Sequence, residues 1–93
     1  MQTPTSPDNP VNFFQSDSEI ALYLSNAFMD DDPNSFVVAL GHVAKAKGIA
    51  KLARDTGLNR ESLYKALSGK TQPRWDTVQR IIKALNMNVK LTL

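Results

Sequence analysis

The chain has 93 residues, which suffice for one small domain and leave no room for a second. It has no cysteine, which excludes disulfides and thiolate zinc sites. Its single histidine makes a histidine-rich metal site or a Ser-His-Asp catalytic triad hard to build. No apolar run approaches the roughly 20 residues of a membrane span, and no signal-peptide pattern is present at the N-terminus. We therefore expect a cytoplasmic, non-enzymatic protein without metal, cofactor or membrane contact.

Acidic and basic residues are separated along the chain. Residues 1–35 hold six acids and no Lys or Arg, a net charge of −6, whereas residues 36–93 hold eleven bases and three acids, a net charge of +8. Such an asymmetry indicates nucleic-acid contact on the basic side. The alternative is a chance partition of solvated surface charges.

Residues 1–15 predict a flexible tail, because three prolines lie among polar residues. Phe13 and Phe14, near its end, are expected to dock the tail onto the folded body. A capping box from Ser16 to Glu19 then opens an amphipathic helix over about residues 17–29.

A second helix is predicted from Pro33 to about Lys47, with Asp32 as its N-cap and Gly48 closing it. The acidic run 30–32 begins like a calcium loop but lacks that loop's glycine and final glutamate. We interpret these acids as a cap and a linker.

Residues 49–68 predict two short helices joined by a tight turn. The first ends at Thr56, and Gly57 supplies the positive φ of the turn. The second runs from about Arg60 to Leu67, with Asn59 able to cap it. The small Ala53 is expected where the two helices cross. Two helices joined by a glycine-containing turn of this length form a helix-turn-helix, which places its second helix in the major groove of DNA.

The second of these helices carries the candidate DNA contacts. The candidate base contacts are Asn59, Arg60, Glu61, Ser62 and Tyr64. Arg60 suits bidentate contact with guanine, and Glu61 can accept a hydrogen bond from cytosine. The candidate phosphate contacts are Lys51, Lys65, Lys70, Thr71 and Arg74, with Lys45 and Lys47 as further members of the basic footprint. The alternative for each residue is a solvated polar side chain on an amphipathic helix.

A further helix is predicted over about residues 75–85, with Trp75 in the core or at its edge. Residues 88–93 then alternate apolar and polar side chains, which predicts a short strand. A lone strand leaves its backbone unpaired, so we expect Val89, Leu91 and Leu93 to form a dimer contact with a second copy. Addition to the sheet edge of another protein and an unpaired tail are the alternatives.

Between Ser16 and the C-terminus the chain resembles antidote proteins of bacterial toxin–antitoxin addiction modules that carry a lambda-repressor-like helix-turn-helix. The matching segments are Ile20–Leu24, Phe36–Ala44, Gly48–Leu67, Pro73–Thr77 and Lys83–Leu85. One departure is Ala50, where members of that family place Thr or Ser. This loses a helix cap and a phosphate contact.

The resemblance implies an all-α fold of five helices in a lambda-repressor-like DNA-binding domain over residues 16–87, with the short C-terminal β-strand following it. It also implies a homodimer that binds double-stranded operator DNA, represses its own operon and neutralises a co-encoded RelE/HigB-like toxin, a small basic ribonuclease. The alternative is a phage-type transcriptional repressor without a toxin partner.

Overall fold

The structure, a computed structural model, describes residues 16–93, and this part of the chain is all-helical. The predicted tail over residues 1–15, with its Phe13–Phe14 anchor, lies outside the described residues. The five helices are α1 (Asp17–Phe28), α2 (Pro33–Lys47), α3 (Ile49–Thr56), α4 (Arg60–Ala66) and α5 (Trp75–Ala84). Their bounds agree with the predicted ones to within about one residue, so the predicted all-α class and the five helices are confirmed.

Three of the helices, α1, α2 and α4, start at the side-chain caps that the sequence predicts, Ser16, Asp32 and Asn59. The Ser16 hydroxyl accepts a hydrogen bond from the Glu19 amide at 3.2 Å, which begins α1. Asp32 accepts from the Asn34 amide at 2.9 Å, and Pro33 occupies the first turn of α2. Each cap satisfies a backbone N–H that has no partner within its own helix.

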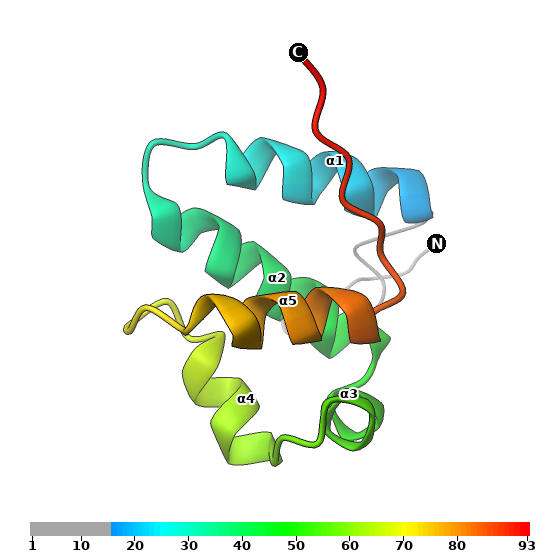
Figure 1. The fold of residues 1–93 in the computed structure, drawn as a ribbon, viewed down its shortest axis with the longest axis vertical. Helices are drawn as coiled ribbons and strands as arrows, with labels where there is room; N and C mark the ends of the chain where they lie inside the picture. The colour runs from blue at the N-terminus through cyan, green and yellow to red at the C-terminus, as the bar shows by residue number, and fades with distance from the viewer. Residues whose placement is uncertain (1–15) are drawn as a thin grey trace, which may run out of the picture.

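All five helices contribute to one hydrophobic core. Its wholly buried side chains are Leu40 and Val43 on α2, Leu63 on α4 and Ile81 on α5. Helix α1 covers α2 on one side of the molecule, and α3 and α4 lie on the opposite side, as Figure 1 shows. The fold thereby exposes two separate surfaces, one on α1 and one on α3 and α4.

The C-terminal residues differ from the prediction. The described part of the chain contains no strand, and residues 88–93 are exposed chain that leaves the end of α5 and passes α1 in the view of Figure 1. A strand needs a neighbouring strand to accept and donate its backbone hydrogen bonds, and residues 16–93 of one chain contain none. The predicted strand is therefore not confirmed in the single chain.

Trp75 also differs from the expectation that it lies in the core or at its edge, since 61% of its surface is exposed. It is the first residue of α5, one turn before Val78, which is the first buried residue of that helix. The indole therefore extends past the packed part of α5.

Candidate nucleic-acid interface

The turn between α3 and α4 is held by Gly57 and Thr56. Gly57 has a left-handed backbone with φ of 78°, and its N–H donates to the Ala53 carbonyl at 3.0 Å. The buried Thr56 hydroxyl donates to the Leu52 carbonyl at 2.8 Å and accepts from the Leu58 amide at 3.2 Å. These bonds fix the position of α4 relative to α3.

Helix α4 is anchored by apolar side chains on one face and exposed on the other. Leu63 is fully buried, as is most of Leu67, whereas Arg60, Glu61, Ser62, Tyr64 and Lys65 are exposed. With 100° between successive residues, Glu61 and Lys65 lie at the middle of the exposed face, and Ser62 and Tyr64 lie at its two flanks. Arg60 lies on the side of Leu67 and is exposed as the first residue of the helix. The structure therefore exposes four of the five candidate base contacts on α4, and it brings three of them, Glu61, Ser62 and Tyr64, to one face.

Asn59, the fifth candidate base contact, has a structural role as a helix cap. It is the N-cap of α4, and its side-chain oxygen accepts from the Ser62 amide at 2.7 Å. The paired contact of asparagine with adenine requires both the oxygen and the NH₂ group of the side chain. In this conformation the oxygen already accepts from the Ser62 amide, which disfavours the paired contact and leaves the NH₂ group to donate to a base.

Two candidate phosphate contacts are joined to neighbouring acids. Lys51 pairs with Asp55 at 2.8 Å, one turn along α3, and Arg74 pairs with Asp76 at 3.1 Å. Both pairs are largely solvent-exposed, and exposed pairs contribute little free energy. A phosphate group can therefore replace either carboxylate at small cost.

The loop between α4 and α5 positions the remaining candidate phosphate contacts, Lys70 and Thr71. The Ser68 hydroxyl accepts from the Lys70 amide at 3.1 Å and donates to the Lys65 carbonyl at 3.0 Å. The Gln72 amide group donates to the Asn34 side chain at 2.7 Å, which ties the loop to the start of α2. Lys70 and Thr71 are exposed on this anchored loop.

Helix α2 adds one basic side chain to this surface. Lys45 of α2 and Tyr64 and Ser68 of the α4 region line a hollow of about 240 Å³. Lys47 instead lies within 3.5 Å of Asp17 and connects the end of α2 to the start of α1. Of these two lysines on α2, only Lys45 is placed beside the exposed face of α4.

Sequence reasoning missed two hydrogen-bonded groups. Thr56 was expected only as a helix end, and its burial depends on α3 packing against the core. The sequence indicates no role for His42, yet its Nδ1 lies 2.7 Å from the Tyr23 hydroxyl of α1. The partners in this second bond are 19 positions apart, so no local pattern indicates it.

Residues 16–93 contain neither a candidate metal site nor a candidate membrane-spanning helix. This part of the chain holds no group of three or more His, Asp or Glu side chains placed to bind a metal ion. None of its helices is long and apolar enough to cross a membrane.

Comparison with known proteins places the chain in a family. Residues 5–93 match the sequence model of a family described as "probable addiction module antidote protein". A protein of Haemophilus influenzae, described only as uncharacterized, is 42% identical over 76 residues, which cover 82% of this chain and 78% of that protein. No solved structure matches the chain. The chain therefore belongs to the family of probable addiction module antidote proteins.

Proposed function

We propose that this protein is a sequence-specific DNA-binding antitoxin, which represses its own operon and neutralises a co-encoded RelE/HigB-like ribonuclease toxin. Membership in an antidote family supports the antitoxin role and a toxin partner. The DNA-binding role is supported by one observation, the exposed polar face of α4 with lysine and arginine side chains around it. The proposal assigns two binding activities and no catalytic step.

In this proposal the α3–turn–α4 unit is a helix-turn-helix, and α4 enters the major groove. Arg60 reads a guanine, while Glu61, Ser62 and Tyr64 contact neighbouring bases. Lys51, Lys65, Lys70, Thr71 and Arg74 contact phosphates and give an affinity that falls steeply with salt. Specificity thus arises on α4, and most of the affinity arises around it.

A homodimer completes the operator-binding unit. Two copies related by a two-fold axis place their α4 helices about 34 Å apart, which matches successive major grooves of a palindrome. The exposed side chains of Val89, Leu91 and Leu93 support a dimer contact through the C-terminal residues. Pairing with the same segment of a second copy supplies the backbone partners that a single chain lacks.

The test is fluorescence anisotropy with DNA from the protein's own promoter and with a scrambled duplex, at about 0.15 M salt. We expect preference for the promoter, and we expect Arg60→Ala to weaken promoter binding by about 1–3 kcal/mol and to relax one base position. Lys83→Ala, which removes one positive charge from α5, serves as the matched control and should leave the preference intact. Equal weak binding to both duplexes would contradict the DNA-binding proposal.

A further inference from the structure

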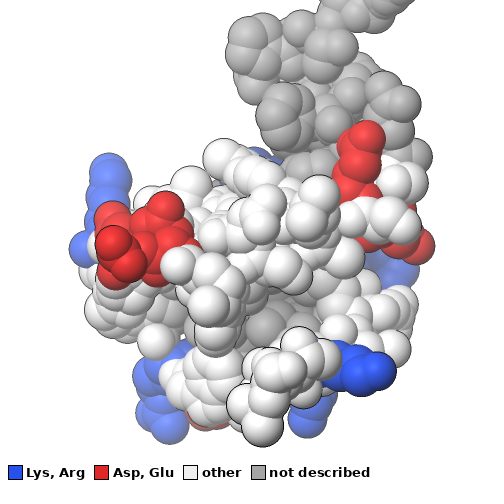
Figure 2. Space-filling model, turned by 90° about the horizontal axis from the view of Figure 1, so that it is seen from above, with Lys and Arg blue, Asp and Glu red and all other residues white. Residues whose placement is uncertain are grey.

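The connection between α1 and α2 carries a concentration of negative charge. Residues 16–35 hold five acids and no Lys or Arg, and Asp30, Asp31 and Asp32 follow one another in the connection. Figure 2 shows acidic side chains gathered at the end of the molecule where Figure 1 places this connection. Phosphate groups are repelled from such a surface, whereas a basic protein surface is attracted to it.

Exposed apolar side chains lie directly beside these acids. Phe28 and Met29, which precede Asp30 in the chain, are 54% and 78% exposed. The Phe28 ring packs edge-to-face on Phe36 of α2, with ring centres 5.3 Å apart, so its orientation is held by the fold. We call Phe28, Met29, Asp30, Asp31 and Asp32 the acidic corner. It combines apolar groups with a charged rim, as specific protein interfaces do.

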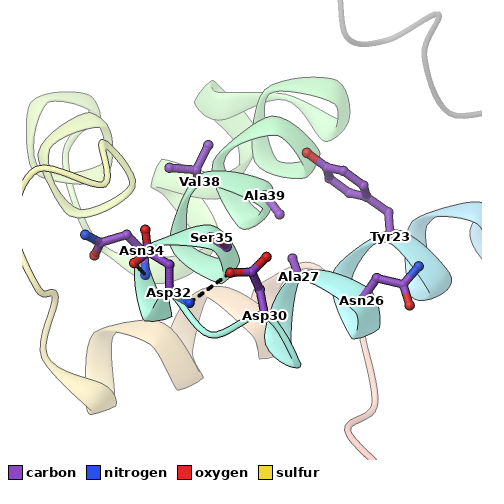
Figure 3. A pocket seen from close by; sticks show the side chains of 9 residues that line it. All are labelled: Tyr23, Asn26, Ala27, Asp30, Asp32, Asn34, Ser35, Val38 and Ala39. Carbon is purple, nitrogen blue, oxygen red and sulfur yellow. Dashed lines mark hydrogen bonds between the residues drawn. The ribbon is translucent and has the colours of Figure 1, made fainter.

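The acidic corner borders a hollow of about 460 Å³ between α1 and α2. Figure 3 shows Asn26 on α1, Asp30 on the connection, and Asn34 and Ser35 at the start of α2 around this hollow. The Asp30 carboxylate accepts from the Asp32 amide at 2.8 Å, and Asp32 caps α2. These bonds hold the carboxylates of Asp30 and Asp32 in position before any partner arrives, which lowers the entropy cost of binding.

We infer that the acidic corner is the surface on which this antitoxin docks the basic face of its toxin. The inference rests on the proposed function, and it names the surface that meets the partner. The negative charge of Asp30, Asp31 and Asp32 favours a basic protein as the partner. Phe28 and Met29 supply apolar contacts, and the hollow can accommodate a side chain of the partner. DNA is excluded as the occupant because the acids repel its phosphates.

The position of the acidic corner separates the two proposed activities. α1 lies on one side of the fold, and α3 and α4 lie on the other (Figure 1). Substitutions of Asp30 and Asp31 therefore change the affinity for the toxin without touching α3 and α4, the helices proposed to position the base contacts.

The test measures binding of the purified protein encoded by the gene adjoining this one, by calorimetry at about 0.15 M salt. The variant Asp30→Asn/Asp31→Asn removes two charges from the acidic corner, keeps one side-chain oxygen at each position and leaves the Asp32 cap in place. The control Asp55→Asn/Asp76→Asn removes two charges from outside the acidic corner, on α3 and at the start of α5. We expect at least tenfold weaker binding for the first variant and an unchanged affinity for the control. Promoter binding by the first variant should equal that of the wild type.

A second variant, Met29→Ser, tests the apolar part of the acidic corner, and it should also weaken binding without lowering the melting temperature. Equal affinities for the wild type and both acidic-corner variants would overturn the assignment of this surface and leave the proposed function intact. If the wild-type protein fails to bind the adjoining gene product, the toxin half of the proposed function falls, and the assigned surface falls with it.

Discussion

The hydroxyl of Thr56 holds the turn between α3 and α4 from inside the protein. It is buried, donates to the Leu52 carbonyl and accepts from the Leu58 amide. Valine has almost the same shape without the hydroxyl, and it leaves the Leu58 amide without this acceptor. A buried donor without a partner costs about 1–3 kcal/mol.

We therefore expect Thr56→Val to lower the free energy of unfolding by about 1–3 kcal/mol in urea titrations. Thr71→Val removes a hydroxyl from an exposed position and should change stability by less than about 0.5 kcal/mol. Equal stability of the two variants would show that the Thr56 hydrogen bonds do not hold the turn.

The partial burial of the Tyr23 hydroxyl makes stability depend on pH at the alkaline end. Burial raises the pKa of the Tyr23 hydroxyl above its ordinary value near 10, because desolvation disfavours the phenolate. Above that pH the unfolded chain loses this proton before the folded protein does. The stabilisation is therefore fully present below pH 10 and is lost as the pH rises through the pKa of the folded state.

Tyr23→Phe should cost at most about 1 kcal/mol at pH 7, through loss of the hydrogen bond to His42. The stability difference between the wild type and this variant should then shrink as the pH rises from 9 to 11. Urea titrations of both proteins at each pH measure the difference and cancel the other groups that titrate in this range. A difference that stays constant with pH would contradict the prediction.

At the scale of the elements, α2 and the end of α4 pack closely because glycines lie at their contact. A Cβ added at Gly41 would lie 3.0 Å from the Leu67 carbonyl oxygen, and one added at Gly69 would lie 2.6 Å from a methyl carbon of Val38. Gly69 also has a φ of 81°, in the left-handed region that favours glycine. This close approach anchors the loop that carries Lys70.

Gly69→Ala should lower stability by more than Gly57→Ala does. Both positions have a positive φ, which costs alanine about 1–2 kcal/mol, but a Cβ at Gly57 meets no atom within 4 Å. The clash with Val38 should add about 1 kcal/mol or more at Gly69. Urea unfolding of the two variants measures the difference, and adding Val38→Ala to Gly69→Ala should remove it. Equal losses in the two single variants would refute the close contact.

At the scale of the whole molecule, the C-terminal residues extend from the helical body with exposed side chains. Deletion of residues 88–93 should convert the proposed dimer to a monomer, measured as mass by light scattering. The melting temperature of the monomer should change little, because Val89, Leu91 and Leu93 add nothing to the core.

Leu91→Ser, on the apolar side of the alternating pattern, should weaken the dimer more than Lys90→Ser, on the polar side. An unchanged dimer mass after the deletion would show that the C-terminal residues are not the dimer contact.

The sequence by itself determined the five helices of residues 16–93 and three of their caps, at Ser16, Asp32 and Asn59. These features depend on residues within one or two turns of each other, so local patterns are sufficient to predict them. The exposed face of α4 follows in the same way, because the buried Leu63 and Leu67 determine which residues point outward.

Only the tertiary structure decided the features that join distant parts of the chain. These are the burial of Thr56, the Tyr23–His42 bond and the contact of Gly69 with Val38. It also decided the exposure of Trp75, since a helix position is buried only where another element covers it. The C-terminal residues show the same dependence. Their side chains alternate as in a strand, but a strand forms only where a second strand pairs with its backbone hydrogen-bonding groups.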